Sequence, residues 1–200
     1  MENYIKVLLK RGDINMDITP IFPTPLGKVS NFISEDERLR LFKSIKNVKH
    51  STHPAIQGHG ASTHENASES SSKFITKDIK NRLEREVNNY GLSSGMGRDL
   101  KIKNIWSNIQ NCNSVLDEHC HPSFFISGAL YINVNDSCSI TFHNPNPHIY
   151  FTHVVNQNEF SFEWSRFPVY NKDLILFPSW LRHGHRNHIN QMDDRIVISF

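Results

Sequence analysis

The change in apolar pattern halfway along the chain most constrains its fold. After Gly97, short apolar runs alternate with turn residues such as Asn135-Asp136, which predicts strands with no helices between them. The predicted strands begin with the apolar run from Leu100 to Ile109 and continue at Phe124–Val134, Ser139–Phe142, Ile149–Val155, Phe160–Trp164, Leu174–Phe177 and Arg195–Phe200. A succession of short strands of this kind favours an antiparallel sandwich or jelly roll.

The first half of the chain has a different organisation. Residues 1–30 are rich in proline near their end and predict an extended arm. Two segments show an apolar face at helical spacing, one from Ser34 to about Val48 and one from Lys77 to about Tyr90. We therefore predict a mainly β, α+β chain with flanking helices. It forms a single domain over 1–200, with arm, helices and a long loop in 1–97 and the β core in 98–200.

Composition limits the class of protein. A hydrophobic fraction of 38% with 13 Phe suffices for a folded core, and no apolar stretch approaches membrane-spanning length. The net charge of +2 provides no basic face that would indicate nucleic acid. Three cysteines without a C-x-x-C pair, and no signal peptide, predict a reduced cytoplasmic setting. The oligomeric state is not predicted.

Histidine is over-represented in the strand-rich half, where eight of the 12 lie between residues 119 and 188. His119 and His121 stand two apart at the mouth of a predicted strand. His183 follows another apolar strand and the proline that ends it. Because jelly-roll topology brings distant strands together, these three imidazoles are predicted to converge on one metal ion.

The last predicted strand adds an arginine to the same region. Period two places Arg195 and Ser199 on one face, and it places Ser127 and Tyr131 on one face of the earlier strand. A buried arginine is costly unless it meets an anion, and its planar fork suits a carboxylate. The predicted pocket would therefore suit a chelating dicarboxylate.

Other histidines are interpreted as packing or surface residues. This applies to a group in the strand-rich half, namely His143, His148, His153 and His188. The segment 50–72 has no periodicity and predicts a long surface loop, so a metal site made of its histidines is disfavoured, namely His50, His53, His59 and His64. The same loop is a candidate lid or substrate contact.

Four motifs together resemble the iron(II)- and 2-oxoglutarate-dependent dioxygenases. They are His119-Cys120-His121-Pro122, Ser127-Gly128-Ala129-Leu130-Tyr131, the segment Phe177 to His183, and Arg195-Ile196-Val197-Ile198-Ser199-Phe200. The chain looks closest to an uncharacterised family of such oxygenases, related to the prolyl hydroxylases. The resemblance spans about residues 104–200.

The resemblance implies a double-stranded β-helix, the cupin-like jelly roll. It also implies Fe(II) held by His119, His121 and His183, with Arg195 pairing the distal carboxylate of 2-oxoglutarate. Tyr131 matches a cosubstrate-contacting tyrosine, and Ser127 and Ser199 face the same cavity. One departure is that His121 stands where most such enzymes carry an acid. Nearby carboxylates are the alternative ligands, namely Asp117 and Glu118.

The function implied is hydroxylation of a small-molecule or peptide substrate, with O₂ consumed and 2-oxoglutarate converted to succinate and CO₂. Trp106, Asn108 and Trp180 are candidate lining residues, equally interpretable as core packing. Two alternatives need no Arg195: a cupin-like metal-binding module without oxygenase activity, and a structural jelly roll whose histidines merely pack. The substrate itself is not predicted, because fold and cofactor do not determine it.

Overall fold

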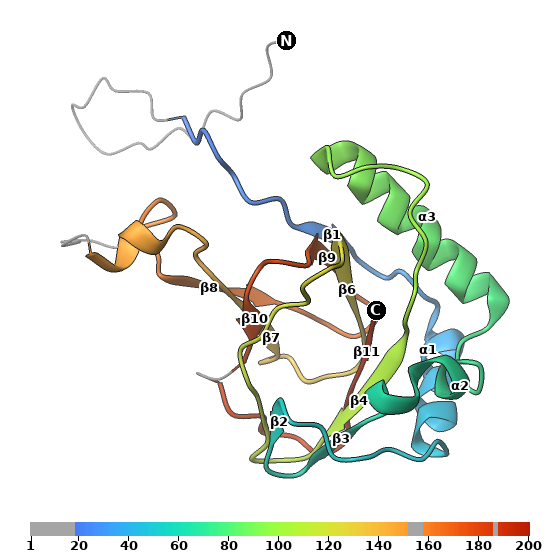
Figure 1. Ribbon diagram of the computed structural model, residues 1–200. Coiled ribbons are helices and arrows are strands. Elements are labelled where there is room, and N and C mark those ends of the chain that lie inside the picture. The colour runs from blue at the N-terminus through green and yellow to red at the C-terminus, as the bar shows by residue number, and fades with distance from the viewer. Residues whose placement is uncertain (1–18, 152–157, 186–187) are drawn as a thin grey trace.

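Two antiparallel sheets face each other and form the double-stranded β-helix (Figure 1). The computed structural model describes residues 19–151, 158–185 and 188–200. The larger sheet has the order β1-β9-β6-β11-β4-β3, and the smaller sheet has the order β10-β7-β8. The larger sheet consists of β1 (Gly27–Val29), β9 (Leu174–Pro178), β6 (Ile126–Asn133), β11 (Arg195–Ser199), β4 (Trp106–Gln110) and β3 (Gly60–Ser62).

The smaller sheet consists of β10 (His183–Gly184), β7 (Ser139–His143) and β8 (Trp164–Pro168). A separate short pair joins β2 (Ile56–Gln57) to β5 (Val115–Leu116). The helical elements are α1 (Glu35–Lys46), α2 (Ala67–Ser71) and α3 (Lys77–Ser94), with 3-10 turns η1 (His64–Asn66) and η2 (Pro147–Phe151). Figure 1 shows α1, α2 and α3 on one side of the molecule and the smaller sheet on the other.

Period two separates the two faces of the larger sheet, as the sequence predicts. In β6 and β11, alternate residues such as Leu130 and Ile198 are fully buried in a core shared with α1 and α3. The intervening residues, such as Tyr131 and Val197, face the smaller sheet and form a second core with Phe142 and other residues. The larger sheet is thus covered by helices on one face and by the smaller sheet on the other.

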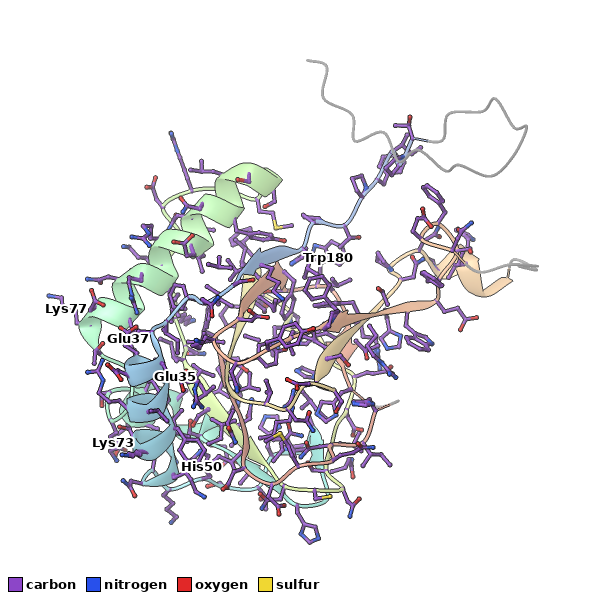
Figure 2. The ribbon with its side chains drawn as sticks, turned by 180° about the vertical axis from the view of Figure 1, so that it is seen from behind. Glu35, Glu37, His50, Lys73, Lys77 and Trp180 are labelled. Carbon is purple, nitrogen blue, oxygen red and sulfur yellow. The ribbon has the colours of Figure 1, made fainter. Side chains whose placement is uncertain are left out.

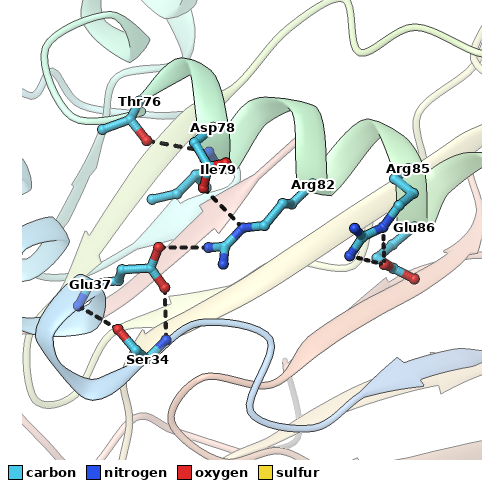
Figure 3. Close-up of polar contacts among 8 residues, drawn as sticks. All are labelled: Ser34, Glu37, Thr76, Asp78, Ile79, Arg82, Arg85 and Glu86. Carbon is cyan, nitrogen blue, oxygen red and sulfur yellow. Dashed lines mark hydrogen bonds and ion pairs between the residues drawn. The ribbon is translucent and has the colours of Figure 1, made fainter.

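The two main helices are joined through one carboxylate (Figure 3). Ser34 and Glu37 form a capping box at the start of α1, in which the Glu37 carboxylate accepts from the Ser34 backbone N–H at 2.8 Å. The other oxygen of Glu37 lies 2.8 Å from Arg82 of α3. Helix α3 ends at Gly95, whose φ of 71° is the left-handed conformation that favours glycine. These contacts fix both helices against the sheet.

Most predicted elements are confirmed, although their bounds shift. The helix predicted to about Val48 ends at Lys46, and the helix predicted to Tyr90 continues to Ser94. The strands predicted around β6, β7, β9 and β11 are present within a few residues of their predicted ends. No helix among the described residues is both long enough and apolar enough to cross a membrane.

Two strand predictions, 149–155 and 160–164, are wrong because local turns take the place of strand pairing among their described residues. Of the predicted strand 149–155, residues 149–151 belong to η2 and 152–157 lie outside the described residues. The predicted strand Phe160–Trp164 is shifted, since β8 only begins at Trp164. Before it, the backbone N–H groups of Phe160, Ser161 and Phe162 donate to the side chain or carbonyl of Asn158 and form a turn.

The segment 50–72 is not the unstructured loop that its composition predicts. It contains β2, β3, η1 and α2. Ser51 and Ser62 form a backbone bridge, and β3 pairs with β4 along Ala61 and Ile109. These strands form by pairing with segments far away in the sequence, so no local alternation of apolar residues predicts them.

The packing of α3 generates a stability prediction. Leu83 is fully buried against the sheet, whereas Leu92 on the same helix is 62% exposed. We expect Leu83→Ala to lower the free energy of unfolding by about 2–5 kcal/mol, because it removes buried methyl groups and leaves a cavity. The matched Leu92→Ala should change it by less than about 0.5 kcal/mol. Urea unfolding followed by circular dichroism measures both, and equal losses would contradict this packing.

Candidate metal centre

Three histidines from two distant segments of the chain converge at one point. The candidate ligand nitrogens of His119, His121 and His183 all lie within 4.8 Å of one another. The ring centroids of His119 and His183 are 4.5 Å apart, and those of His121 and His183 are 5.2 Å apart. The predicted convergence is therefore present in the structure.

Backbone hydrogen bonds hold these segments together. His119 and His183 form an isolated antiparallel bridge, in which each backbone N–H donates to the other residue's carbonyl at 2.9 Å. The backbone N–H of His121 donates to the carbonyl of Ser179 at 2.8 Å. A Cβ atom at Gly184 would lie 3.0 Å from the carbonyl oxygens of Leu116 and Asp117. Glycine at this position lets the two segments approach so closely.

The imidazoles present free lone pairs to the centre. Nδ1 of His119 lies 2.7 Å from the carbonyl oxygen of Asp117, and Nδ1 of His183 lies 2.8 Å from that of Leu181. A carbonyl oxygen only accepts hydrogen bonds, so Nδ1 carries the proton and Nε2 keeps its lone pair. Such backbone partners orient metal-bound histidines.

Burial keeps the cluster neutral. Removal from water lowers the pKa of His183 to about 3 and that of His121 to about 4, and it also lowers the pKa of His119. Neutral imidazole is the form that binds a metal ion. The donor set therefore fits a first-row divalent metal such as Fe(II).

The nearby carboxylates are engaged elsewhere. The Asp117 carboxylate accepts from the Gln57 side chain at 2.7 Å. Glu118 lies 2.9 Å from Nε2 of His143 and 3.5 Å from the exposed Arg182 guanidinium. Neither belongs to the metal-ligating cluster found among the described residues. This geometry favours His121 over an acid as the second ligand.

A cavity of about 250 Å³ extends from the histidines into the space between the sheets. Strands β4 and β11 supply one wall, because Arg195 lies opposite Gln110 and Ser199 lies opposite Trp106 in the antiparallel register. Arg195 is only 7% exposed and forms no ion pair with any described residue. Its guanidinium is an uncompensated positive charge inside the cavity, as a site for an anion requires.

Hydroxyl groups line the inner part of the cavity. Tyr131 is almost fully buried there, and burial raises its pKa above the ordinary value. Ser127 shares a hydrogen bond of 2.8 Å with Ser179, and Ser199 accepts from Asn108 at 3.3 Å. Ser139 also lines the cavity, and its buried hydroxyl has no hydrogen-bond partner. A buried hydroxyl without a partner among the described residues, in the same cavity as a guanidinium that has no ion pair there, fits a bound carboxylate.

The segment 50–72 contributes to this site, contrary to its interpretation as a surface loop. His53 and His64 line the cavity mouth, with ring centroids 5.2 Å apart. His64 in turn contacts Trp106, and Trp106 contacts the ring of His121. His50 instead lies after α1 and hydrogen-bonds to Ser107 (Figure 2).

The remaining candidates have other environments. His59 is exposed, His143 pairs with Glu118, and His153 lies outside the described residues. His148 is exposed and His188 is half-buried. Trp106 and Asn108 line the cavity as predicted, but Trp180 (Figure 2) is 53% exposed and does not. It follows the proline that ends β9, where the chain turns outward.

The polar cavity residues that sequence reasoning missed include Gln110, Ser139 and His185. His185 is buried beside Gln110, and burial lowers its pKa to about 3. For Gln110, a signal was available, because period two along β4 places it on the same face as Trp106 and Asn108. No such signal existed for His185, since its segment lies outside a long strand.

Comparisons with known proteins agree with this geometry. A family model described as "Putative 2OG-Fe(II) oxygenase" matches residues 104–200. No curated protein matches the chain.

Solved structures share the fold. HygX from Streptomyces hygroscopicus with nickel and 2-oxoglutarate bound is 13% identical, with a TM-score of 0.55, covering 88% of this chain and 82% of that one. A Pseudomonas putida prolyl-4-hydroxylase is 11% identical with a TM-score of 0.53, covering 88% and 90%. A Trichoplax adhaerens prolyl hydroxylase in complex with a hypoxia inducible factor peptide is 11% identical with a TM-score of 0.53, covering 87% and 81%.

At such low identities the solved structures establish the double-stranded β-helix alone. The family match covers His119, His121, His183 and Arg195. Residues 104–200 of this chain match the family of 2OG-Fe(II) oxygenases, whose double-stranded β-helix the chain shares.

Proposed function

We propose that this protein hydroxylates a small-molecule or peptide substrate, with Fe(II) held by His119, His121 and His183. The observation that carries the proposal is the convergence of three neutral imidazoles at the mouth of a cavity that contains an unpaired arginine. In the overall reaction, a substrate C–H group becomes C–OH while O₂ and 2-oxoglutarate yield succinate and CO₂.

In this proposal Arg195 binds the distal carboxylate of 2-oxoglutarate. The Tyr131 O–H donates a hydrogen bond to the same carboxylate, since burial raises the pKa of Tyr131 and keeps the hydroxyl protonated. Ser127 and Ser199 face the cosubstrate, although their bonds to Ser179 and Asn108 also hold the wall in place. Ser139 joins this set because its buried hydroxyl lacks a partner.

The iron and cosubstrate supply the oxidising power when bound, and the chain supplies orientation and exclusion of water. Apolar walls from Trp106, Phe177 and Val197 enclose the cavity. Three neutral ligands leave the metal more positive than two histidines and an acid would. That charge suits a cosubstrate with two carboxylates.

The substrate enters beside His53 and His64. A second cavity of about 150 Å³ adjoins this mouth and shares His64, Trp106 and His121 with the first. Its outer wall includes Phe124, whose ring lies 6.0 Å from the Lys103 ammonium. These residues support the proposal that the segment 50–72 contacts the substrate.

The proposal includes a single domain over residues 1–200 and a cytoplasmic location. The location is supported by Cys112, Cys120 and Cys138, all of which are free thiols in the structure. A cupin-like module without oxygenase activity is not favoured, because such a module would not need a buried Arg195. A purely structural jelly roll would not need three histidines whose candidate ligand nitrogens lie within 4.8 Å of one another.

The ligand assignment predicts which variants lose iron. His183→Ala and His121→Ala should each weaken Fe(II) binding by more than about 10-fold. Removing only a residue that hydrogen-bonds to a metal ligand already weakens metal binding by about 10- to 100-fold, and here the ligand itself is lost. Asp117→Asn and Glu118→Gln should retain it, because their carboxylates lie outside the cluster. Metal content after anaerobic reconstitution measures this, with exposed His59→Ala as control. Iron loss in Asp117→Asn or Glu118→Gln, with retention in His121→Ala, would reverse the assignment.

The arginine assignment predicts a separate loss of cosubstrate. Arg195→Ala should weaken 2-oxoglutarate binding by about 10- to 100-fold, since charge-assisted hydrogen bonds are lost, while Fe(II) affinity is unchanged. Anaerobic titration of the Fe(II) protein with 2-oxoglutarate, followed by the visible charge-transfer band, measures the affinity. The matched control is Arg182→Ala, whose side chain is 58% exposed. Equal loss of iron and cosubstrate would contradict the role.

A further inference from the structure

Arg195 has one hydrogen-bond partner among the described residues, and that partner is neutral. Nη1 of Arg195 donates to Oε1 of Gln110 at 2.5 Å, and both side chains are buried. The two residues lie directly opposite each other in β11 and β4. An amide oxygen orients the guanidinium but leaves its positive charge uncompensated, whereas a carboxylate there would neutralise it.

The orientation of the Gln110 amide depends on His185. Nε2 of Gln110 lies 3.1 Å from Nε2 of His185. Nδ1 of His185 lies 3.1 Å from the carbonyl oxygen of His188 and 3.4 Å from the backbone nitrogen of Leu116, so the carbonyl is its closer neighbour. Because the carbonyl oxygen only accepts, Nδ1 of His185 carries the proton and Nε2 accepts from the Gln110 amide.

A single direction of donation therefore runs through the chain of groups. His185 donates to the His188 carbonyl, Gln110 donates to His185, and Arg195 donates to Gln110. The reverse orientation of Gln110 would place its NH₂ group against the guanidinium, donor against donor. The Arg195 guanidinium, which can only donate, and the acceptor Nε2 of His185 together determine which end of the Gln110 amide meets Arg195.

We propose that Gln110 and His185 are positioning residues. They hold the Arg195 guanidinium in place for the distal carboxylate of the cosubstrate without neutralising its positive charge. They make the site selective for a five-carbon 2-oxo diacid over a 2-oxo monoacid of the same length. This inference rests on the proposed function, in which Arg195 binds that carboxylate.

The test compares two cosubstrates that differ only at that end. 2-Oxopentanoate has the 2-oxo acid group of 2-oxoglutarate, but a methyl group replaces the distal carboxylate. The affinity of the Fe(II)-loaded protein for each is measured anaerobically from the charge-transfer band. The ratio of the two dissociation constants reports only on the distal carboxylate, and a general loss of folding or of iron would not change it selectively.

Paired variants separate positioning from packing. His185→Leu removes the acceptor for Gln110 and should reduce the preference for 2-oxoglutarate by about tenfold, the equivalent of one hydrogen bond. His185→Gln can accept from Gln110 through Oε1 and should keep the preference within about threefold of wild type. The control is His188→Ala, because only the backbone carbonyl of that residue takes part.

Gln110→Glu tests the charge argument without changing side-chain size. The added carboxylate would neutralise Arg195, so this variant should lose preference for 2-oxoglutarate by at least about tenfold and keep its iron. It also decides the question if His185→Leu fails to fold.

The outcomes distinguish the two proposals. If wild type itself does not prefer 2-oxoglutarate over 2-oxopentanoate, the Arg195 assignment fails and this inference fails with it. If wild type discriminates but His185→Leu and Gln110→Glu keep the full preference, only the positioning role is overturned.

Discussion

The backbone bridge between His119 and His183 is the interaction on which the site depends. Its two hydrogen bonds of 2.9 Å join the segment before β6 to the start of β10. Opposed residues of an antiparallel bridge project their side chains on the same side, so the two imidazoles become neighbours. Gly184 permits this pairing because a larger residue would press on the backbone at Leu116 and Asp117. The same main-chain contacts thus serve both the β fold and the metal centre.

The electrostatics of the cavity follow from the absence of acid in its wall. Among the residues that the structure describes, no aspartate or glutamate lines either cavity, and Arg195 is buried with the Gln110 amide as its one partner. A buried cation of this kind costs stability and would be replaced by an apolar residue if packing alone mattered. Its burial is understandable as part of an anion site. The same reasoning explains why Gln110 is an amide rather than an acid.

The mouth of the cavity is built by a part of the chain with no obvious periodicity. Edge-on contacts run from His53 to His64 and from His64 to Trp106, and a tilted contact joins Trp106 to His121. A change in how the segment 50–72 packs would therefore shift the ring of His121, a candidate metal ligand. In the proposed function, the substrate entrance and the candidate metal ligands are therefore connected through these ring contacts.

The sequence by itself determined the two main helices, strands β4, β6, β9 and β11 of the larger sheet, and part of the cavity lining. Helical and period-two patterns are local properties, so Leu83 could be assigned to the apolar face of its helix, and Arg195 and Tyr131 to the cavity side of their strands, without coordinates. Motif resemblance then joined His119, His121 and His183. Only the tertiary structure decided the rest. It placed His53, His64 and His185 at the site, removed Trp180 from it, and directed Asp117 and Glu118 to other partners. Such contacts depend on pairings between distant segments, and no pattern of neighbouring residues encodes which side chain faces which.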